Sequence, residues 1–169
     1  TLADLVHRLT ARFLHAAKRA RPDIQVAVSF LCKRVDAPNE GDYKKLRRLV
    51  RYVRATIHIP LVLGWDESGN IVWSIDASFA VHMNMKSHTG YCMTMGRGAA
   101  VSGSTTQTIT TRSSTEAELV GLDDGIGFIE WTSRICKAQV KDYPEDHPLK
   151  QLGCNNMVKQ DNTSTIKMA

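Results

Sequence analysis

The chain has 169 residues, of which 43% are hydrophobic and 23% charged, a composition typical of a globular protein with one sizeable domain. It has no run of about 18 apolar residues, and it does not start with a charged stretch followed by an apolar one, so the sequence predicts neither a membrane span nor a secretory signal. We therefore expect an intracellular protein, cytoplasmic or nuclear, that is not secreted and has no membrane partner.

The net charge of +5 is unevenly distributed along the chain. Residues 1–70 hold 13 lysines and arginines against 7 aspartates and glutamates, a balance of +6. Residues 71–169 hold 9 against 10, a balance of −1. A basic first part and a nearly neutral second part suggest two parts with different functions.

The cysteines are scattered, and no pair of them has the spacing of a metal-binding motif. We interpret them as free thiols in a reducing compartment, and zinc binding is not expected. The four residues are Cys32, Cys92, Cys136 and Cys154.

Residues 1–59 are predicted to form a small helical unit. In "LADLVHRLTARFLHAAKRA" the apolar residues recur on one side of a helix. Pro22 suits the first turn of a second helix, "PDIQVAVSFLCKRV". A third helix is predicted in "GDYKKLRRLVRYVRAT", where an apolar stripe again forms.

The third predicted helix also carries a stripe of basic side chains. A stripe of this kind is either a solvated helix face or a set of contacts to nucleic-acid phosphates, and the charge pattern alone leaves both alternatives open. The stripe, with spacings of three, four and three residues, consists of Lys44, Arg47, Arg51 and Arg54.

Residues 60–169 change to the pattern of an α/β domain. "PLVLGW" and "IVWSIDASFA" are predicted strands around a turn at Gly69 and Asn70, and "KSHTGYCMTMG" and "AAVSGSTTQTIT" are two more strands. A long helix is predicted from about Ser114 to Val140, followed by a last strand, "CNNMVKQ", that ends at Asp161. A last strand that returns to the same sheet after a helix predicts a mixed sheet.

Glu118 is the acid in the long helix that needs an explanation. At about 3.6 residues per turn it lies in line with Leu122, Ile126 and Ile129, on the stripe expected to face the sheet. An acid there is either a residue at the rim of the core or part of a functional site.

The other acids of this helix have structural interpretations. Glu116 follows Ser113 by three residues, the spacing of a capping box. Asp123 and Asp124 fall in the middle of the helix, so we interpret them as surface charges and not as the paired aspartates of a polymerase hairpin.

Two further aspartates belong to strands. Asp76 falls inside an otherwise apolar strand, where a buried and unpaired carboxylate would cost several kcal/mol, so it needs a cation, a hydrogen-bond network or an open cleft. Asp161 stands where the last strand ends and a helix begins, and it is either a helix cap or a site residue.

Asp76, Glu118 and Asp161 can converge, because two come from strands and one from a helix packed on the sheet. Three converging carboxylates repel one another unless divalent cations lie among them. Oxygen ligands with open positions favour Mg²⁺ or Mn²⁺. Two such ions about 4 Å apart are the usual arrangement for attack of water on a phosphodiester. The sequence therefore predicts a two-metal site at these residues.

Three segments around these acids resemble the ribonuclease H domain of copia-type LTR retrotransposon Pol polyproteins. They are "IDASFAVHMNMKSHTGYCMTMG", "TRSSTEAELVGLDD" and "KQDNTSTIKMA", in this order. The upstream "AKRARPDIQVAVSFLCKRV" and "DYKKLRRLVRYVRAT" resemble the helical segment between polymerase and ribonuclease H in the same polyproteins. The resemblance covers essentially the whole chain, and "SSTEAEL" is its most specific part.

The resemblance implies a ribonuclease H-like fold with three antiparallel strands, a long helix and a parallel strand, after a thumb-like or connection-like segment of reverse transcriptase. It implies hydrolysis of the RNA strand of RNA/DNA hybrids, with Asp76, Glu118 and Asp161 as the first, second and third metal-binding acids. Such hybrids are usually recognised through the minor groove. The rest of the Pol polyprotein is the second expected partner.

We interpret the chain as a fragment, because it lacks an initial Met and ends at "DNTSTIKMA" just as a helix is predicted to begin. The family's fold continues with more helix, a fifth strand and a further acidic or histidine site residue. We therefore expect a C-terminally truncated domain whose intact parent is a Mg²⁺-dependent nuclease, and little or no activity from these residues alone.

The main alternative is a non-catalytic nucleic-acid-binding module, either a decayed element or a connection-type domain. A weaker alternative is a host protein that has adopted the domain. A pure binding module has no reason to keep all three carboxylates, and this sequence keeps them.

Overall fold

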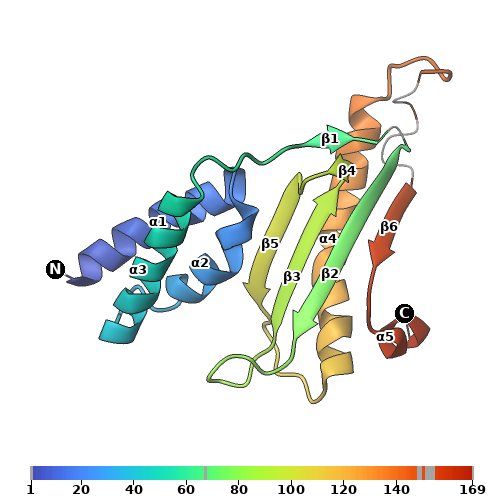
Figure 1. The fold of residues 1–169 in the computed structure, drawn as a ribbon. Helices are drawn as coiled ribbons and strands as arrows, with labels where there is room; N and C mark the ends of the chain where they lie inside the picture. The colour runs from blue at the N-terminus through green and yellow to red at the C-terminus, as the bar shows by residue number, and fades with distance from the viewer. Residues whose placement is uncertain (1, 67, 148–149, 151–154, 169) are drawn as a thin grey trace. The chain divides into compact units, whose positions relative to one another are not determined.

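The computed structural model describes residues 2–66, 68–147, 150 and 155–168. The chain divides into two compact units, one ending at Leu61 and the other beginning at Val62. Figure 1 shows the helices of the first unit and, in the second, a sheet with a long helix. The two units are described separately below.

The first unit consists of α1 (Leu2–Arg19), the short 3₁₀ helix η1 (Pro22–Ile24), α2 (Gln25–Cys32) and α3 (Glu40–Ala55). The three predicted helices are confirmed, although the second ends at Cys32 and not at Val35. Their apolar faces meet in a core that consists of Val6, Ala17, Ile24, Val28, Leu31, Leu46 and Leu49.

The start of α3 is held by a capping box that the sequence analysis did not identify. The side chain of Asn39 accepts a hydrogen bond from the Asp42 amide at 2.9 Å, and the Asp42 carboxylate accepts one from the Asn39 amide at 3.1 Å. Arg34 Nε donates to the same carboxylate at 3.0 Å. Asp42 is buried, and its charge is stabilised by the Asn39 amide, by the Arg34 guanidinium and by the Lys45 ammonium at 3.9 Å.

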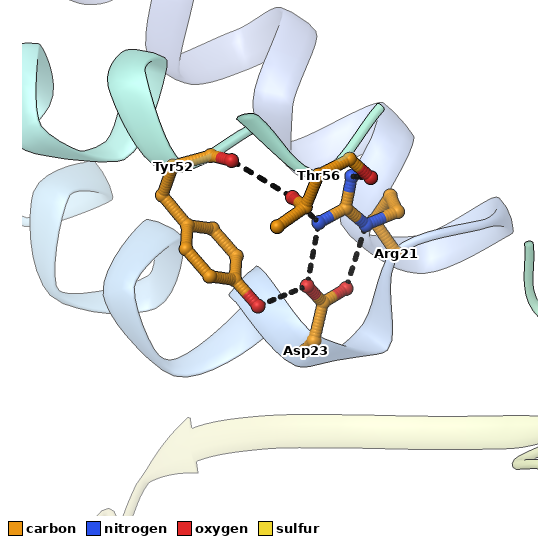
Figure 2. A network of polar contacts seen from close by, with 4 residues as sticks. All are labelled: Arg21, Asp23, Tyr52 and Thr56. Carbon is orange, nitrogen blue, oxygen red and sulfur yellow. Dashed lines mark hydrogen bonds and ion pairs between the residues drawn. The ribbon is translucent and has the colours of Figure 1, made fainter. Parts of the chain in front are cut away.

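The end of α3 is tied to the turn before α2 by the polar network in Figure 2. Arg21 donates from Nε and Nη2 to the two oxygens of Asp23, at 2.9 and 2.7 Å. The Tyr52 hydroxyl donates to Asp23 at 3.0 Å, and Arg21 donates to the Thr56 hydroxyl at 2.7 Å. Bidentate pairing of this kind fixes orientation as well as distance, so the network sets where α3 ends against η1.

The second unit is built on a four-stranded sheet in the order β5-β3-β2-β6. The strands β2 (Asn70–Ser78), β3 (His88–Thr94) and β5 (Val101–Thr106) pair antiparallel, and β6 (Asn155–Lys159) pairs parallel to β2. The helix α4 (Ser114–Gln139) connects β5 to β6 across one face of the sheet, and α5 (Thr163–Met168) follows β6. The unit is thus a mixed α/β domain with a mixed sheet, as predicted.

The predicted pairing of "PLVLGW" with the next strand around Gly69 and Asn70 is wrong. That segment contributes β1 (Gly64–Trp65), which pairs with β4 (Gly96–Arg97) in a separate two-stranded sheet. The physical reason is that β3 and β6 occupy both edges of β2, so β2 has no free edge for a hairpin partner.

Two glycines let the chain after β3 approach β1. Gly96 and Gly98 have φ values of 141° and 67°, in the region that side chains rarely adopt. A Cβ atom at Gly98 would lie 2.2 Å from the Val62 carbonyl oxygen. Only glycine therefore permits this crossing of the two segments.

Side chains along β2 alternate between the core and the solvent. Ile71, Trp73 and Ile75 are buried, whereas Ser74 and Asp76 are exposed. The buried side chains therefore belong to the core of the unit, and Asp76 is open to solvent.

The predicted sheet-facing stripe of α4 is only partly right. Glu118 is buried, but Ile126 is 46% exposed, and the buried positions after Glu118 are Gly121, Gly125 and Thr132. A Cβ atom on Gly125 would lie 2.5 Å from Cδ1 of Ile75, so the helix backbone itself packs on the sheet there. Counting apolar side chains missed this contact, because glycine has no side chain to count.

Candidate metal centre

The structure brings Asp76, Glu118 and Asp161 together. Each offers a carboxylate oxygen, and these three oxygens lie within 4.8 Å of one another. It is the sole cluster of three or more His, Cys, Asp or Glu ligands among the residues that the structure describes. The three acids that the sequence analysis selected therefore meet at one point, and their role as metal ligands is a proposal taken up below.

The topology explains why acids so distant in sequence meet. Asp76 lies two residues before the end of β2, and β6 runs parallel beside β2 with Lys159 opposite Ser74. The chain that leaves β6 therefore reaches the end of β2 that carries Asp76, and Asp161 is in that connection to α5. Glu118 approaches from the amino-terminal part of α4, which packs on β2 and β3.

The start of α4 is held by its N-cap. The Ser113 hydroxyl accepts from the Glu116 amide at 3.1 Å, as predicted. The Glu116 carboxylate, however, accepts from the amide of Arg112 at 2.6 Å and not from that of Ser113, so the predicted reciprocal contact is shifted by one residue. Glu116 is therefore used in holding the helix end, and it is not part of the cluster.

Glu118 is the buried member of the cluster, with 6% of its surface exposed. Its Oε2 accepts hydrogen bonds from the Ala77 amide and from Nε2 of Gln160, both at 3.1 Å. Burial raises the pKa of Glu118, and the charges of Asp76 and Asp161 also raise it, while the two hydrogen bonds lower it. The ionised cluster is therefore costly without a cation.

The donor set fits a hard divalent cation. All three groups are carboxylates, and Asp76 and Asp161 are exposed to solvent. Among the described residues, no lysine or arginine forms an ion pair with any of the three. Oxygen ligands with uncompensated negative charge are what Mg²⁺ and Mn²⁺ bind.

Gln160 is a site residue that the sequence analysis missed. It contacts Glu118 directly, yet it is uncharged and belongs to none of the patterns used to select the acids. Its position next to Asp161 in the chain was the one available signal.

Asp123 and Asp124 are exposed, as predicted for surface charges, and lie outside the cluster. Asp124 is hydrogen-bonded to the sheet, because Thr89 donates to its Oδ2 at 3.2 Å. This contact helps to seat α4 on β3.

The basic stripe lies on α3, in the first unit. Lys44, Arg47, Arg51 and Arg54 are all exposed, and Lys44 pairs with Glu40 at 2.8 Å. That pair is solvated on both sides, so it leaves the ammonium available to other anions. Up to Leu61 the chain holds 13 lysines and arginines against 5 aspartates and glutamates, a balance of +8. The first unit is therefore strongly basic.

Two further predictions can be compared with the structure. Cys32, Cys92 and Cys136 are free thiols, as predicted, whereas Cys154 lies outside the described residues. Within the described part of the chain, every helix is too short or too polar to cross a membrane.

Comparison with known proteins finds one curated relative, an uncharacterized mitochondrial protein of Arabidopsis thaliana, AtMg00810. The two sequences are 32% identical over 114 residues, which is 67% of this chain and 48% of the relative. The chain thus matches about half the length of that relative. No protein-family profile matches the chain, and no solved structure matches it.

Proposed function

We propose that this chain is part of the Pol polyprotein of a copia-type retrotransposon and contains the core of its ribonuclease H domain. The intact parent would hydrolyse the RNA strand of RNA/DNA hybrids with divalent metal ions. The convergence of Asp76, Glu118 and Asp161 within 4.8 Å is the observation that carries the proposal. The mixed sheet with α4 across one face is compatible with a ribonuclease H-like fold.

The proposal assigns different roles to the exposed and buried acids. Asp76 and Asp161 are exposed, so a phosphodiester can approach them from solvent. Glu118 accepts a hydrogen bond from the Ala77 amide, which holds it in place beside the other two acids. When bound, two Mg²⁺ or Mn²⁺ ions would supply Lewis-acid stabilisation and activate water. The three carboxylates would hold these ions.

The retrotransposon origin rests on the motifs around the carboxylates, and a sequence relative with an uncharacterized function is compatible with it. The first unit would be the thumb-like or connection-like segment before the nuclease domain. Its balance of +8 supports contact with a nucleic-acid backbone. Activity of these 169 residues alone is expected to be weak or absent, because the ribonuclease H domains that they resemble have one further acidic or histidine residue at the site.

The test is cleavage of a hybrid labelled on its RNA strand, in Mg²⁺, by the chain extended through its natural downstream sequence. Asp76→Asn should abolish cleavage, and EDTA should do the same to the unaltered protein. Asp123→Asn is the matched control, because it removes an exposed carboxylate outside the cluster. A folded protein that binds the hybrid and leaves it intact would disprove the nuclease proposal.

The second candidate function is nucleic-acid binding without catalysis, favoured by the exposed basic stripe on α3. A binding module should keep its affinity for the hybrid in EDTA. Replacing Arg51 by Gln should lower the slope of log K against log salt by about one unit if that arginine contacts a phosphate. Replacing exposed Arg134, which pairs with Glu130 in the second unit, should leave the slope unchanged.

A further inference from the structure

The side chain of Gln160 joins two of the three acids through hydrogen bonds. Its Nε2 donates to Oε2 of Glu118 at 3.1 Å. Its Oε1 accepts from the backbone amide of Asp161 at 2.9 Å and from that of Asn162 at 3.4 Å. One amide group thus contacts an acid of α4 at one end and the backbone that carries Asp161 at the other.

We propose that Gln160 is a positioning residue of the metal centre, which holds Glu118 and the Asp161 backbone at a set separation. The inference rests on the proposed function, since it concerns the same three carboxylates. Gln160 itself is not proposed as a ligand. It acts through Glu118, as groups outside the ligand set do in other metal sites.

The bonds on Glu118 show how this positioning works. The Ala77 amide and the Gln160 amide both donate to Oε2, so the carboxylate is held by one oxygen from two directions. The other oxygen, Oε1, takes no part in either bond. The rotation of the carboxylate is thereby limited while one oxygen remains for a cation.

The uncharged nature of Gln160 is as important as its reach. A lysine or arginine at this position would also donate to Glu118. Its positive charge, however, would neutralise part of the negative charge that attracts a divalent cation. Asp42 in α3 illustrates that outcome, because Arg34 donates to its buried carboxylate at 3.0 Å. An amide supplies the hydrogen bond and leaves the charge of the cluster intact.

The same amide also fixes the connection that carries Asp161. Asp161 and Asn162 both donate backbone N–H groups to Gln160 Oε1. Asn162 in turn accepts from the amide of Thr165, in the first turns of α5. Gln160 therefore links the position of Asp161 to α4 as well as to β6, and its loss should loosen both acids relative to each other.

The test is the dissociation constant of Mn²⁺, measured on the full 169-residue chain by the electron paramagnetic resonance signal of free Mn²⁺. Gln160→Met keeps a similar length and removes both hydrogen-bonding atoms. We expect about tenfold weaker binding, the lower end of the effect of groups that orient metal ligands. Equal binding by wild type and Gln160→Met would overturn the inference.

The matched control is Asn156→Leu. Asn156, in β6, is another side-chain amide that donates to α4, at the Ser133 hydroxyl and away from the carboxylates. This variant should lose stability to heat in metal-free buffer and should bind Mn²⁺ as the wild type does. If it weakened binding as much as Gln160→Met, a general role in packing β6 on α4 would replace the proposed one.

A double-mutant cycle separates positioning from structural support. If Gln160 acts through Glu118, its replacement should weaken Mn²⁺ binding much less when Glu118 is already Gln. If the two replacements had additive effects on the free energy of Mn²⁺ binding, the inference would be contradicted. If Gln160→Met does not fold, Gln160→Asn provides the same measurement, because it keeps the amide but is too short to reach both partners.

Failure of this inference is distinguishable from failure of the proposed function. If wild-type Mn²⁺ binding does not depend on Asp76, the metal centre itself is disproved, and the positioning role with it. If Asp76→Asn abolishes binding while Gln160→Met leaves it unchanged, the metal centre stands and the role of Gln160 is wrong.

Discussion

The two units each bury one carboxylate near the start of a helix, but they treat its charge in opposite ways. Asp42 in α3 is 3% exposed and Glu118 in α4 is 6% exposed. Asp42 has the guanidinium of Arg34 beside it, and hydrogen bonds, that of the Asn39 amide first, hold its pKa below the usual range. Glu118 has uncharged donors and two neighbouring acids, and its pKa is raised, chiefly by burial.

The comparison shows that burial of an acid does not by itself indicate function. Asp42 is satisfied inside its own unit, so its burial is explained by the capping of α3. Glu118 is hydrogen-bonded, but within the described residues no lysine or arginine pairs with it, and Asp76 and Asp161 add repulsion. The presence or absence of a counter-charge is therefore the feature that distinguishes the two.

The largest expected effect is that of metal on the stability of the second unit. With free Mg²⁺ at about 100 times its dissociation constant, binding should stabilise the wild type by about 2.7 kcal/mol, and EDTA should remove this gain. Glu118→Gln should show a clearly smaller gain, because it binds the ion more weakly, whereas Asp42→Asn should keep the full gain. Thermal unfolding with and without Mg²⁺ measures the difference. If Mg²⁺ stabilised Glu118→Gln as much as wild type, Glu118 would not take part in metal binding and would not differ from Asp42 in this respect.

The next largest effect on stability is expected from replacing Gly125, because this residue sets how closely α4 approaches the sheet that Glu118 faces. Gly125→Ala places a Cβ atom 2.5 Å from Ile75, whereas nothing lies within 4 Å of a Cβ atom at Gly127. Both replacements gain the same helix propensity, so the difference between the two variants reports the clash, about 1–3 kcal/mol. Urea unfolding gives the two free energies. Equal stabilities would show that the helix shifts without cost.

Matched replacements of the two acids should change stability in opposite directions in EDTA. Asp42→Asn should cost about 1–2 kcal/mol, because it removes the charge from hydrogen bonds to Arg34 and the Asn39 amide. Glu118→Gln should raise the free energy of unfolding, because it removes the repulsion from Asp76 and Asp161. Urea titrations of both variants beside wild type measure the signs. A destabilised Glu118→Gln would mean that its charge is compensated after all.

The smallest expected effect is the pH dependence of those two differences in EDTA. The lowered pKa of Asp42 contributes stability above its unfolded value, near pH 4, and this stability is lost as pH falls through the folded value. The raised pKa of Glu118 gives a contribution to stability with the opposite dependence on pH. Its stability contribution is fully present below the unfolded value and is lost as pH rises through the folded one.

The two pH windows should therefore lie on opposite sides of about pH 4. Unfolding free energies of wild type and both variants, measured from neutral to acid pH, test this. The advantage of Glu118→Gln should shrink from neutral pH down to that value, and the deficit of Asp42→Asn should shrink below it. If both differences changed over the same pH range, the pKa values of Asp42 and Glu118 would not be shifted in opposite directions.

The sequence was a good guide wherever a local pattern decides the outcome. The apolar residues at every second position, such as Trp73 and Ile75, predicted the strand β2, because successive strand residues point to opposite faces. The spacing of Ser113 and Glu116 predicted the start of α4, because a cap involves neighbouring residues alone. Local patterns failed where a distant segment decides, as for β1, which pairs with β4 instead of β2.

The sequence by itself thus determined the order of the longer helices and strands, though not β4, and the three acids worth testing. Tertiary structure alone decided that their oxygens lie within 4.8 Å of one another. It also decided that glycines of α4 face the sheet and that Gln160 contacts Glu118. The reason is that periodicity reports which face of an element a side chain occupies. The partner at that face depends on how β6 and α4 meet β2, and residues far apart in the chain settle this.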